Sequence, residues 1–165
     1  MSHTDTGNTA ALQIHTDTVK PEWIDYNHHM NDGYYVVAFT SATDAVQDLV
    51  GLDAQYRQSS GCSIYTVEAH LQYLREVPAN AQLSFTSFIL GVDEKRVHML
   101  HAMYNADQGY LAASHELMLL HVNQKLGKTT AMPSAIQQHL SRLQDQHRNL
   151  PVPVPTGRSI KPVIA

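Results

Sequence analysis

The densest group of side chains able to do acid, base or hydrogen-bonding chemistry lies between Trp23 and Gly33, in the run Trp-Ile-Asp-Tyr-Asn-His-His-Met-Asn-Asp-Gly. Within it, Asp25, Asn27 and His29 carry groups that could position water or move protons. The run stands directly ahead of the best-marked helix of the chain, and a helix N-terminus offers unpaired amides and a partial positive charge. Such an end suits a carbonyl oxygen that gains negative charge during acyl transfer. A polar loop with a helix cap explains the same residues, so spacing alone leaves both interpretations open.

The helix that would position this loop is predicted between Gly33 and Val50. An apolar residue recurs there every three or four positions, at Tyr35, Phe39, Ala42, Val46 and Leu49. This spacing gives a helix with one apolar stripe. Asn31 or Asp32 can cap its first turn, and Gly51 can end it. Because the polar face is thin, the helix is expected to lie against or inside a sheet.

The remaining segments favour strands. Alternating or continuous apolar residues mark residues 12–19, 63–74, 82–92, 96–104 and 110–122. Short polar turns at 93–95 and 105–109 join the later strands as hairpins. The order of a strand, a long helix and a run of strands predicts an α+β fold, with one helix packed on an antiparallel sheet.

Four parts of the chain are expected. A flexible N-terminus spans residues 1–11, the main domain 12–132, a C-terminal helix 133–149, and a Pro-rich tail 150–165 that is predicted to be extended and poorly packed. One helix covers only one face of a sheet, and free edges favour pairing with a second copy. A homodimer is therefore predicted, with a tetramer possible by back-to-back packing.

Composition narrows the class of protein. The chain has 165 residues, 11 Lys plus Arg against 15 Asp plus Glu, and no basic cluster longer than Lys95-Arg96, which argues against nucleic-acid binding. It has no apolar run of the roughly 20 residues that a membrane helix needs, and its polar start lacks a secretory signal. The single Cys62 suits a reducing compartment. These features predict a cytoplasmic protein without a membrane partner, and no metal-ligand spacing is recognised.

Several segments resemble a known family. The run Asp25 to Tyr35, Asp-x-Asn-x-His-Met-Asn-Asp-Gly-x-Tyr, resembles the signature of hot-dog-fold acyl thioesterases. The runs Tyr65–Glu76, Asp93–His98 and Glu116–Val122 are similar to segments of bacterial betainyl-CoA thioesterases of carnitine breakdown. The resemblance implies the hot-dog fold, an α+β fold in which an antiparallel sheet of about five strands wraps one long central helix. It also implies pairing through the sheets and an active site at the dimer interface, near the helix N-terminus.

The resemblance further implies a thioester hydrolase acting on a small acyl-CoA, with betainyl-CoA as the first candidate, and no cofactor. Carried over by position, Asp25, Asn27 and His29 are catalytic-loop residues, and Glu68 matches an acid that several members bring from the next strand. In the hydroxybenzoyl-CoA branch a second Asp stands where Asn27 stands here, and an amide cannot act as that acid does. Either Asp25 or Glu68 is therefore the base or nucleophile, and the sequence does not rank them.

Substrate contacts are predicted at two places. The amides of Asn31, Asp32 and Gly33 would polarise the thioester carbonyl. The side chains of Lys95 and Arg96 could meet the phosphates of coenzyme A, although hairpin charges are normally solvated.

A trimethylammonium group would need aromatic faces, because it donates no hydrogen bond. Trp23, Tyr26 and Tyr35 lie beside the loop and are the first candidates, with Tyr35 also fitting the helix's apolar stripe. Three other functions remain in view. One is a thioesterase for another short acyl-CoA or acyl-carrier-protein substrate, and another is a non-catalytic acyl-CoA binding or sensing module. The third is a hot-dog dehydratase or hydratase, whose usual catalytic His with Pro-Gly-rich surroundings is not found.

Overall fold

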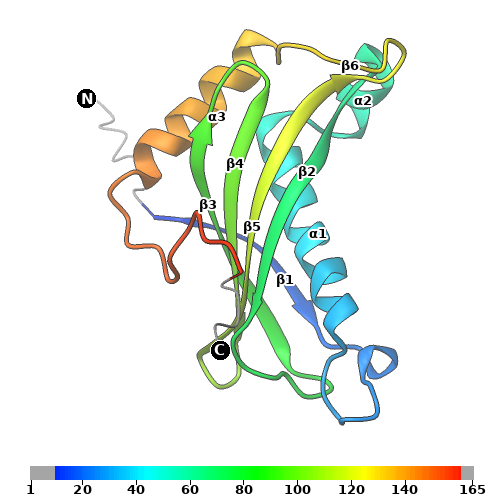
Figure 1. Cartoon of the computed structure of the whole chain (residues 1–165), viewed down its shortest axis with the longest axis vertical. Helices are drawn as coiled ribbons and strands as arrows, with labels where there is room; N and C mark the ends of the chain where they lie inside the picture. The colour runs from blue at the N-terminus through cyan, green and yellow to red at the C-terminus, as the bar shows by residue number, and fades with distance from the viewer. Residues whose placement is uncertain (1–9, 161–165) are drawn as a thin grey trace, which may run out of the picture.

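The structure, a computed structural model, describes residues 10–160 of the chain. The segment predicted to be a flexible N-terminus therefore lies almost wholly outside the described residues, as does the end of the tail. The elements in chain order are β1 (Leu12–Thr18), a short 3-10 helix η1 (Pro21–Trp23), α1 (Asp32–Val50), α2 (Ala54–Ser60), β2 (Cys62–Tyr73), β3 (Gln82–Val92), β4 (Arg96–Asn105), β5 (Tyr110–Asn123), β6 (Lys128–Thr129) and α3 (Ser134–His147) (Figure 1).

All strand pairs are antiparallel, and the main sheet has the order β1-β3-β4-β5-β2, with the two-residue β6 paired to β5. The sheet curls around α1, which crosses one of its faces (Figure 1). The predicted α+β architecture of one long helix and about five strands is confirmed. The short elements η1, α2 and β6 were not predicted, because each is too short to show a periodic pattern.

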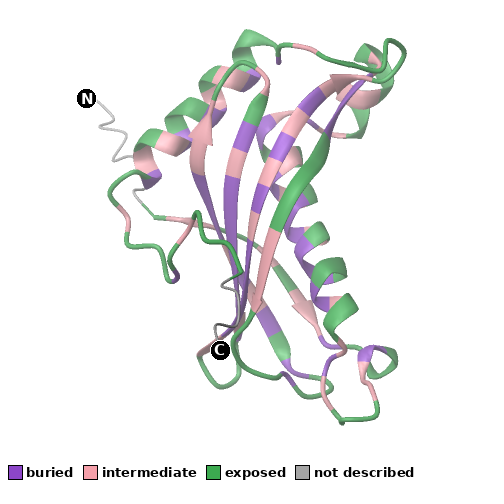
Figure 2. Ribbon diagram, viewed as in Figure 1, coloured by how far each residue is buried: buried purple, intermediate pink, exposed green. Residues whose placement is uncertain are grey.

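Helix α1 is held by its apolar face. Its buried residues are Tyr35, Ala38, Phe39, Ala42, Thr43, Val46 and Val50. Figure 2 shows these buried positions on the side of α1 that faces the sheet. The predicted cap is confirmed, because the Asn31 side chain accepts a hydrogen bond from Gly33 N–H at 3.0 Å. Gly51 ends the helix with a φ of 89°, a left-handed conformation that suits glycine.

Strand β2 contains a bulge that changes which side chains face α1. Thr66 pairs with Leu119 and Glu68 pairs with Met118, so Val67 is an extra residue. Before the bulge the side chains that face α1 are even-numbered, such as Ile64 and Thr66. After it they are odd-numbered, such as Leu71 and Tyr73. The bulge interrupts the alternation of β2 at Val67, and Glu68 lies on the side of the sheet away from α1.

Helix α3 covers an edge that β1 leaves open. The pairing of β1 with β3 ends at Ser87, and beyond it Ile89 N–H donates to Nδ1 of His147 in α3 at 2.9 Å. The apolar face of α3, with Leu140 the most buried of its residues, packs on the same end of the sheet as the last turns of α1. An otherwise exposed strand edge is thereby protected.

The segment after α3 runs across the side of the sheet away from α1 (Figure 1). Val154 is 8% exposed and packs with Phe88 and Leu100. Farther along, Gly157 N–H donates to both carboxylate oxygens of Glu116, at 2.9 and 3.0 Å. The prediction of a poorly packed tail is therefore wrong for its described part, since Val154 and Gly157 fasten it to the sheet.

Two buried histidines lie between α1 and the sheet. His101 bonds Thr43 Oγ1 through Nε2 at 3.0 Å and Ser87 Oγ through Nδ1 at 2.7 Å. Burial away from water, with His115 and His15 nearby, lowers the pKa of His101 to about 3, and burial lowers the pKa of His115 to about 4. Both rings are therefore neutral at pH 7. His98 lies on the opposite face from His101, because residues three apart on a strand point to opposite faces.

The packing of Val154 predicts a stability difference between two tail positions. Val154→Ala should lower the free energy of unfolding by about 1 to 2 kcal/mol, because it removes buried methyl groups. The matched change Val152→Ala, at a residue that is 36% exposed, should cost less than about 0.5 kcal/mol. Urea unfolding followed by circular dichroism measures both, and equal effects would mean that the tail does not pack as described.

The buried histidines predict a pH dependence of stability. Their pKa values are depressed in the folded state, so only the unfolded chain takes up protons as the pH falls below about 6.5. Their contribution is fully present above pH 7 and is lost on acidification, by about 1 kcal/mol for each ring between pH 7 and pH 5.5. Urea unfolding at the two pH values checks this. An unchanged free energy of unfolding would contradict the neutral buried rings.

Candidate active site

The polar loop before α1 is a small hairpin closed by main-chain hydrogen bonds. Ile24 and Met30 form an antiparallel bridge, and Asn31 N–H donates to Trp23 C=O at 2.9 Å. Met30 N–H also donates to Val77 C=O at 2.9 Å, which ties the hairpin to the segment after β2. Met30 and Trp23 are themselves buried. The loop is therefore held in one place against the first turn of α1.

Asp25 and Asn27 lie together at the tip of this hairpin. Asn27 N–H donates to the Asp25 carboxylate at 2.8 Å, and its side-chain amide lies 3.5 Å from the other carboxylate oxygen. Asp25 is half-buried. The turn needs His28 in a left-handed conformation, with a φ of 67°, which costs a non-glycine residue about 1 kcal/mol or more. The loop thus accepts backbone strain while it holds the Asp25 carboxylate in place.

His29 points to a carboxylate that the sequence did not single out. Its Nε2 lies 3.2 Å from a carboxylate oxygen of Glu76, in the segment between β2 and β3. The main chain of His29 accepts a hydrogen bond from Asp25 N–H at 3.0 Å. Glu76 follows a strand end and belongs to no periodic pattern, so only the tertiary contact reveals it.

The helix N-terminus offers one free amide rather than the three predicted. Asn31 N–H is used by Trp23 C=O, and Gly33 N–H is used by the Asn31 side chain. Amides of a first helical turn have no partner inside the helix. In the part of the chain that the structure describes, Asp32 N–H makes no hydrogen bond. The prediction is therefore wrong for Asn31 and Gly33 and leaves Asp32 as the possible donor.

The three aromatic residues predicted to bind the acyl group do not share a site. Trp23 is 4% exposed, stacks on Tyr34 at 5.5 Å and has the Lys20 ammonium 4.8 Å from its ring centroid. Tyr35 is buried in the core, where burial raises its pKa to about 12. Tyr26 is 88% exposed. Within one protomer these rings cannot form an aromatic cage, because two of them are already covered.

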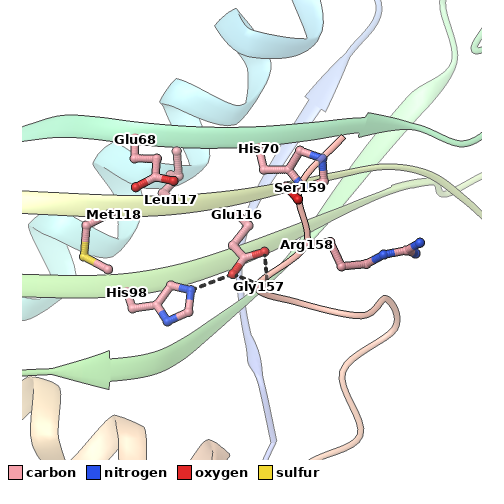
Figure 3. A pocket seen from close by; sticks show the side chains of 9 residues that line it. All are labelled: Glu68, His70, His98, Glu116, Leu117, Met118, Gly157, Arg158 and Ser159. Carbon is pink, nitrogen blue, oxygen red and sulfur yellow. Dashed lines mark hydrogen bonds and ion pairs between the residues drawn. The ribbon is translucent and has the colours of Figure 1, made fainter. Parts of the chain in front are cut away.

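Glu68 lies in a separate pocket on the side of the sheet away from α1 (Figure 3). The pocket has a volume of about 300 Å³. Its lining comes from three strands and the tail and consists of Glu68, His70, His98, Glu116, Leu117, Met118, Gly157, Arg158 and Ser159. The structure therefore does not bring Glu68 together with Asp25, Asn27 and His29 in one protomer.

The polar contacts in that pocket hold the tail. His98 Nε2 lies 2.7 Å from a Glu116 carboxylate oxygen, and the same carboxylate accepts both hydrogen bonds from Gly157 N–H (Figure 3). The Glu116 side chain is 13% exposed. A partly buried carboxylate with these partners has a structural explanation, since it fastens the tail to β4 and β5.

Lys95 and Arg96, predicted to meet coenzyme A, lie in and after the β3–β4 turn. This turn is at the end of the sheet opposite to the N-terminus of α1 (Figure 1). The Arg96 guanidinium donates to the Asp93 carboxylate at 2.6 and 2.7 Å and holds the pKa of Asp93 below its usual value. Lys95 lies 3.3 Å from Glu94. The two cations are thus paired locally and are not near the loop of the same protomer.

A groove of about 440 Å³ lies between α1 and β2. It begins at Val36 in the first turns of α1 and reaches Gln47, with Thr43 and His115 among its lining residues. Asp44 also lines it, and burial raises the pKa of this carboxyl, with Arg57 acting in the opposite direction. The groove therefore leads along α1 from the neighbourhood of the hairpin.

Within residues 10–160, no group of three histidine, cysteine or acidic side chains is placed to hold a metal ion. Among these residues, none of the helices combines the length and the apolar composition of a membrane-spanning segment.

Comparison with known proteins gives a consistent set of relatives. Residues 19–140 match the sequence profile of the thioesterase-like superfamily. The betainyl-CoA thioesterase of Pseudomonas aeruginosa is 40% identical over 149 residues, which cover 90% of this chain and 94% of that protein. The L-carnitine dehydrogenase/betainyl-CoA thioesterase of Agrobacterium fabrum is 42% identical over 152 residues, 92% of this chain. The chain spans 31% of the length of this second relative.

Solved structures show the same fold. The protein SAV2348 of Staphylococcus aureus, solved in complex with CoA, superimposes with a TM-score of 0.85 at 26% identity and covers 93% of this chain and 98% of its own. A putative thioesterase of Pseudomonas putida KT2440 gives a TM-score of 0.80 at 35% identity with the same coverage.

Proposed function

The chain belongs to the thioesterase-like superfamily, and we propose that it hydrolyses a small acyl-CoA, betainyl-CoA, to glycine betaine and free CoA. The observation that carries the proposal is the hairpin that fixes the Asp25 carboxylate beside the N-terminus of α1. A carboxylate next to a helix end is the pairing that hydrolysis of an acyl group needs, with a base for water and a donor for the oxyanion.

In the proposed reaction the Asp25 carboxylate takes a proton from water, and the water oxygen attacks the thioester carbonyl carbon. Asp32 N–H, with the positive end of the α1 dipole behind it, stabilises the negative charge that forms on the carbonyl oxygen. The tetrahedral intermediate then collapses, the C–S bond breaks, and the CoA thiolate takes up the proton that Asp25 received. Asn27 keeps the Asp25 carboxylate oriented, and His29 with Glu76 completes the polar wall of the loop.

Asp25 is the stronger candidate for the base. The sequence left Asp25 and Glu68 equal, but the bulge in β2 turns Glu68 away from α1, into the pocket beneath the tail. A general base must come within hydrogen-bond reach of the attacking water. We propose that Asp25 meets that condition for a carbonyl bound at Asp32 N–H, because the hydrogen bond from Asn31 N–H to Trp23 C=O holds the hairpin against the first turn of α1.

Lys95 and Arg96 stay proposed contacts for the phosphates of coenzyme A. When CoA binds, the Arg96 guanidinium would leave the Asp93 carboxylate and bind a phosphate group. A phosphate, like a carboxylate, can accept two parallel hydrogen bonds from a guanidinium. Thioester hydrolysis requires no metal or redox cofactor. The free thiol of Cys62 fits a reducing compartment, and the cytoplasm remains the predicted location.

We further propose that the enzyme is a homodimer paired through β2. This strand is at one end of the main sheet and has 12 residues, so its outer backbone groups are free to pair with a second copy. Large apolar side chains are exposed on β2 and on the outer face of α1, at Tyr65, Val67, Val36 and Val37. The tail occupies the opposite side of the sheet, which favours a dimer over a back-to-back tetramer.

Conservative substitutions separate the two carboxylates. Asp25→Asn should lower kcat for betainyl-CoA by about 100-fold or more, because the amide cannot accept the proton from water. Glu68→Gln should leave kcat within about threefold, because a carboxylate outside hydrogen-bond reach of the water supplies no base. A free-thiol assay measures both.

Met30→Leu serves as the control, because it changes a buried residue of the same hairpin at nearly constant volume. It should retain the parental rate. Full activity of folded Asp25→Asn would remove Asp25 from the mechanism, and a large loss for Glu68→Gln would assign the base to Glu68. Tight CoA-ester binding without thiol release by the parent would instead indicate a binding module.

The dimer proposal predicts a mass of twice the 18.4 kDa chain in light scattering. Val67→Lys should give monomers with reduced activity, because a charge on the edge strand opposes pairing. Leu126→Lys, at a residue that is exposed in the β5–β6 turn, should leave the dimer intact. A fully active parental monomer would contradict the paired arrangement.

A further inference from the structure

The chemistry of betainyl-CoA constrains where its cation can bind. One methylene group separates the ammonium nitrogen from the thioester carbonyl carbon, so the ammonium site and the carbonyl site must adjoin. The trimethylammonium group donates no hydrogen bond, and proteins hold such a group with aromatic faces within about 6 Å and with carboxylates. The residues that meet these conditions must lie at the first turn of α1, beside Asp32 N–H.

Four other positions, one carboxylate and three aromatic rings, fail this test. Asp44 lines the groove along α1 but lies 12 residues beyond Asp32, which is about 18 Å along a helix that rises about 1.5 Å per residue. Trp23 and Tyr35 are buried and covered by neighbouring side chains. Tyr26 stands alone in solvent. None of them can place an aromatic face or a carboxylate next to the carbonyl within one protomer.

Tyr73 lies at the required place. It is the last residue of β2, after the bulge, and therefore faces α1. Its hydroxyl donates to the Asp32 main-chain carbonyl at 3.2 Å, and its ring meets the Tyr35 ring at 5.2 Å and 88°. These two contacts fix the ring beside the first turn of α1. Tyr73 nevertheless remains 52% exposed, so part of its ring is available to a ligand.

Asp32 supplies the negative charge. Burial raises the pKa of Tyr73, and the Asp32 carboxylate adds to this increase, which means that its charge acts on the Tyr73 hydroxyl. One carboxylate oxygen of Asp32 accepts a hydrogen bond from Gly33 N–H at 2.9 Å. The carboxylate is thus held next to the amide that would bind the carbonyl oxygen.

This arrangement favours a substrate that brings its own cation. A carboxylate beside a developing oxyanion repels it, which slows the hydrolysis of neutral acyl groups. An ammonium group between the two charges offsets the repulsion and is attracted by both. The Asp32 carboxylate can therefore disfavour neutral esters and favour a betainyl ester.

We propose that the Tyr73 ring and the Asp32 carboxylate hold the trimethylammonium group of the substrate and set the preference for a cationic acyl group. The inference rests on the proposed function, because it assumes that the carbonyl binds at Asp32 N–H. It assigns specificity to a tyrosine that comes from the edge strand rather than from the catalytic loop.

The test compares betainyl-CoA with its neutral isostere, 3,3-dimethylbutyryl-CoA. The parental enzyme should prefer betainyl-CoA by about tenfold or more in kcat/KM. Tyr73→Leu should lower kcat/KM for betainyl-CoA by about tenfold and leave the neutral ester within about threefold, so that the preference disappears. Tyr73→Phe keeps the ring and should keep the preference. Asp32→Asn keeps the main-chain amide and removes the charge, so the ratio of kcat/KM for betainyl-CoA to kcat/KM for the neutral ester should fall.

Each contrary outcome has a distinct meaning. A parental enzyme that hydrolyses both esters equally, or a Tyr73→Leu variant that loses both equally, overturns the cation site and leaves the thioesterase proposal standing. A parental enzyme that releases no thiol from any CoA ester overturns the proposed function itself. Circular dichroism of each variant confirms folding, and the Phe and Asn variants carry the test where the Leu variant does not fold.

Discussion

The structure depends on the burial of one face of α1 against the curled sheet. Burial of large apolar side chains is the main favourable term in folding, and here it fixes the position and direction of a single long helix. That direction brings the N-terminus of α1 to the end of β2 and to the segment that follows it, where Tyr73 and Glu76 lie. The proposed chemistry uses this meeting point, because hairpin, helix dipole and edge strand come together there.

The same constraint explains what covers the rest of the sheet. Because one helix covers only one face of the sheet, other segments must cover the remaining apolar surface and the strand edges. Helix α3 protects the free part of β3, and Val154 in the tail covers Phe88 and Leu100 on the opposite side. Of the two edge strands, β2 has 12 residues and β1 has 7, and the longer open edge is the physical reason for proposing a dimer at β2.

The sequence predicted the features that depend on local pattern. Helical spacing located α1 and its Asn31 cap, alternation located the strands, and the density of polar groups pointed to the loop around Asp25. It failed where the outcome depends on contacts between distant segments. The bulge at Val67 puts Thr66 and Glu68 on opposite sides of the sheet, although an alternating strand would put them on the same side, and Tyr34 and Lys20 cover the Trp23 ring. Neither effect leaves a periodic signal in the chain.

In the proposed mechanism the thioester carbonyl binds at the N-terminus of α1, within reach of Asp25. The most direct measurement is a crystal structure with a non-hydrolysable ketone analogue of betainyl-CoA, in which a methylene group replaces the thioester sulfur. We expect the ketone oxygen about 3 Å from Asp32 N, with the Asp25 carboxylate on the open face of the carbonyl. An analogue whose ketone lies in the pocket beside Glu68, with Asp32 N–H unoccupied, would contradict it.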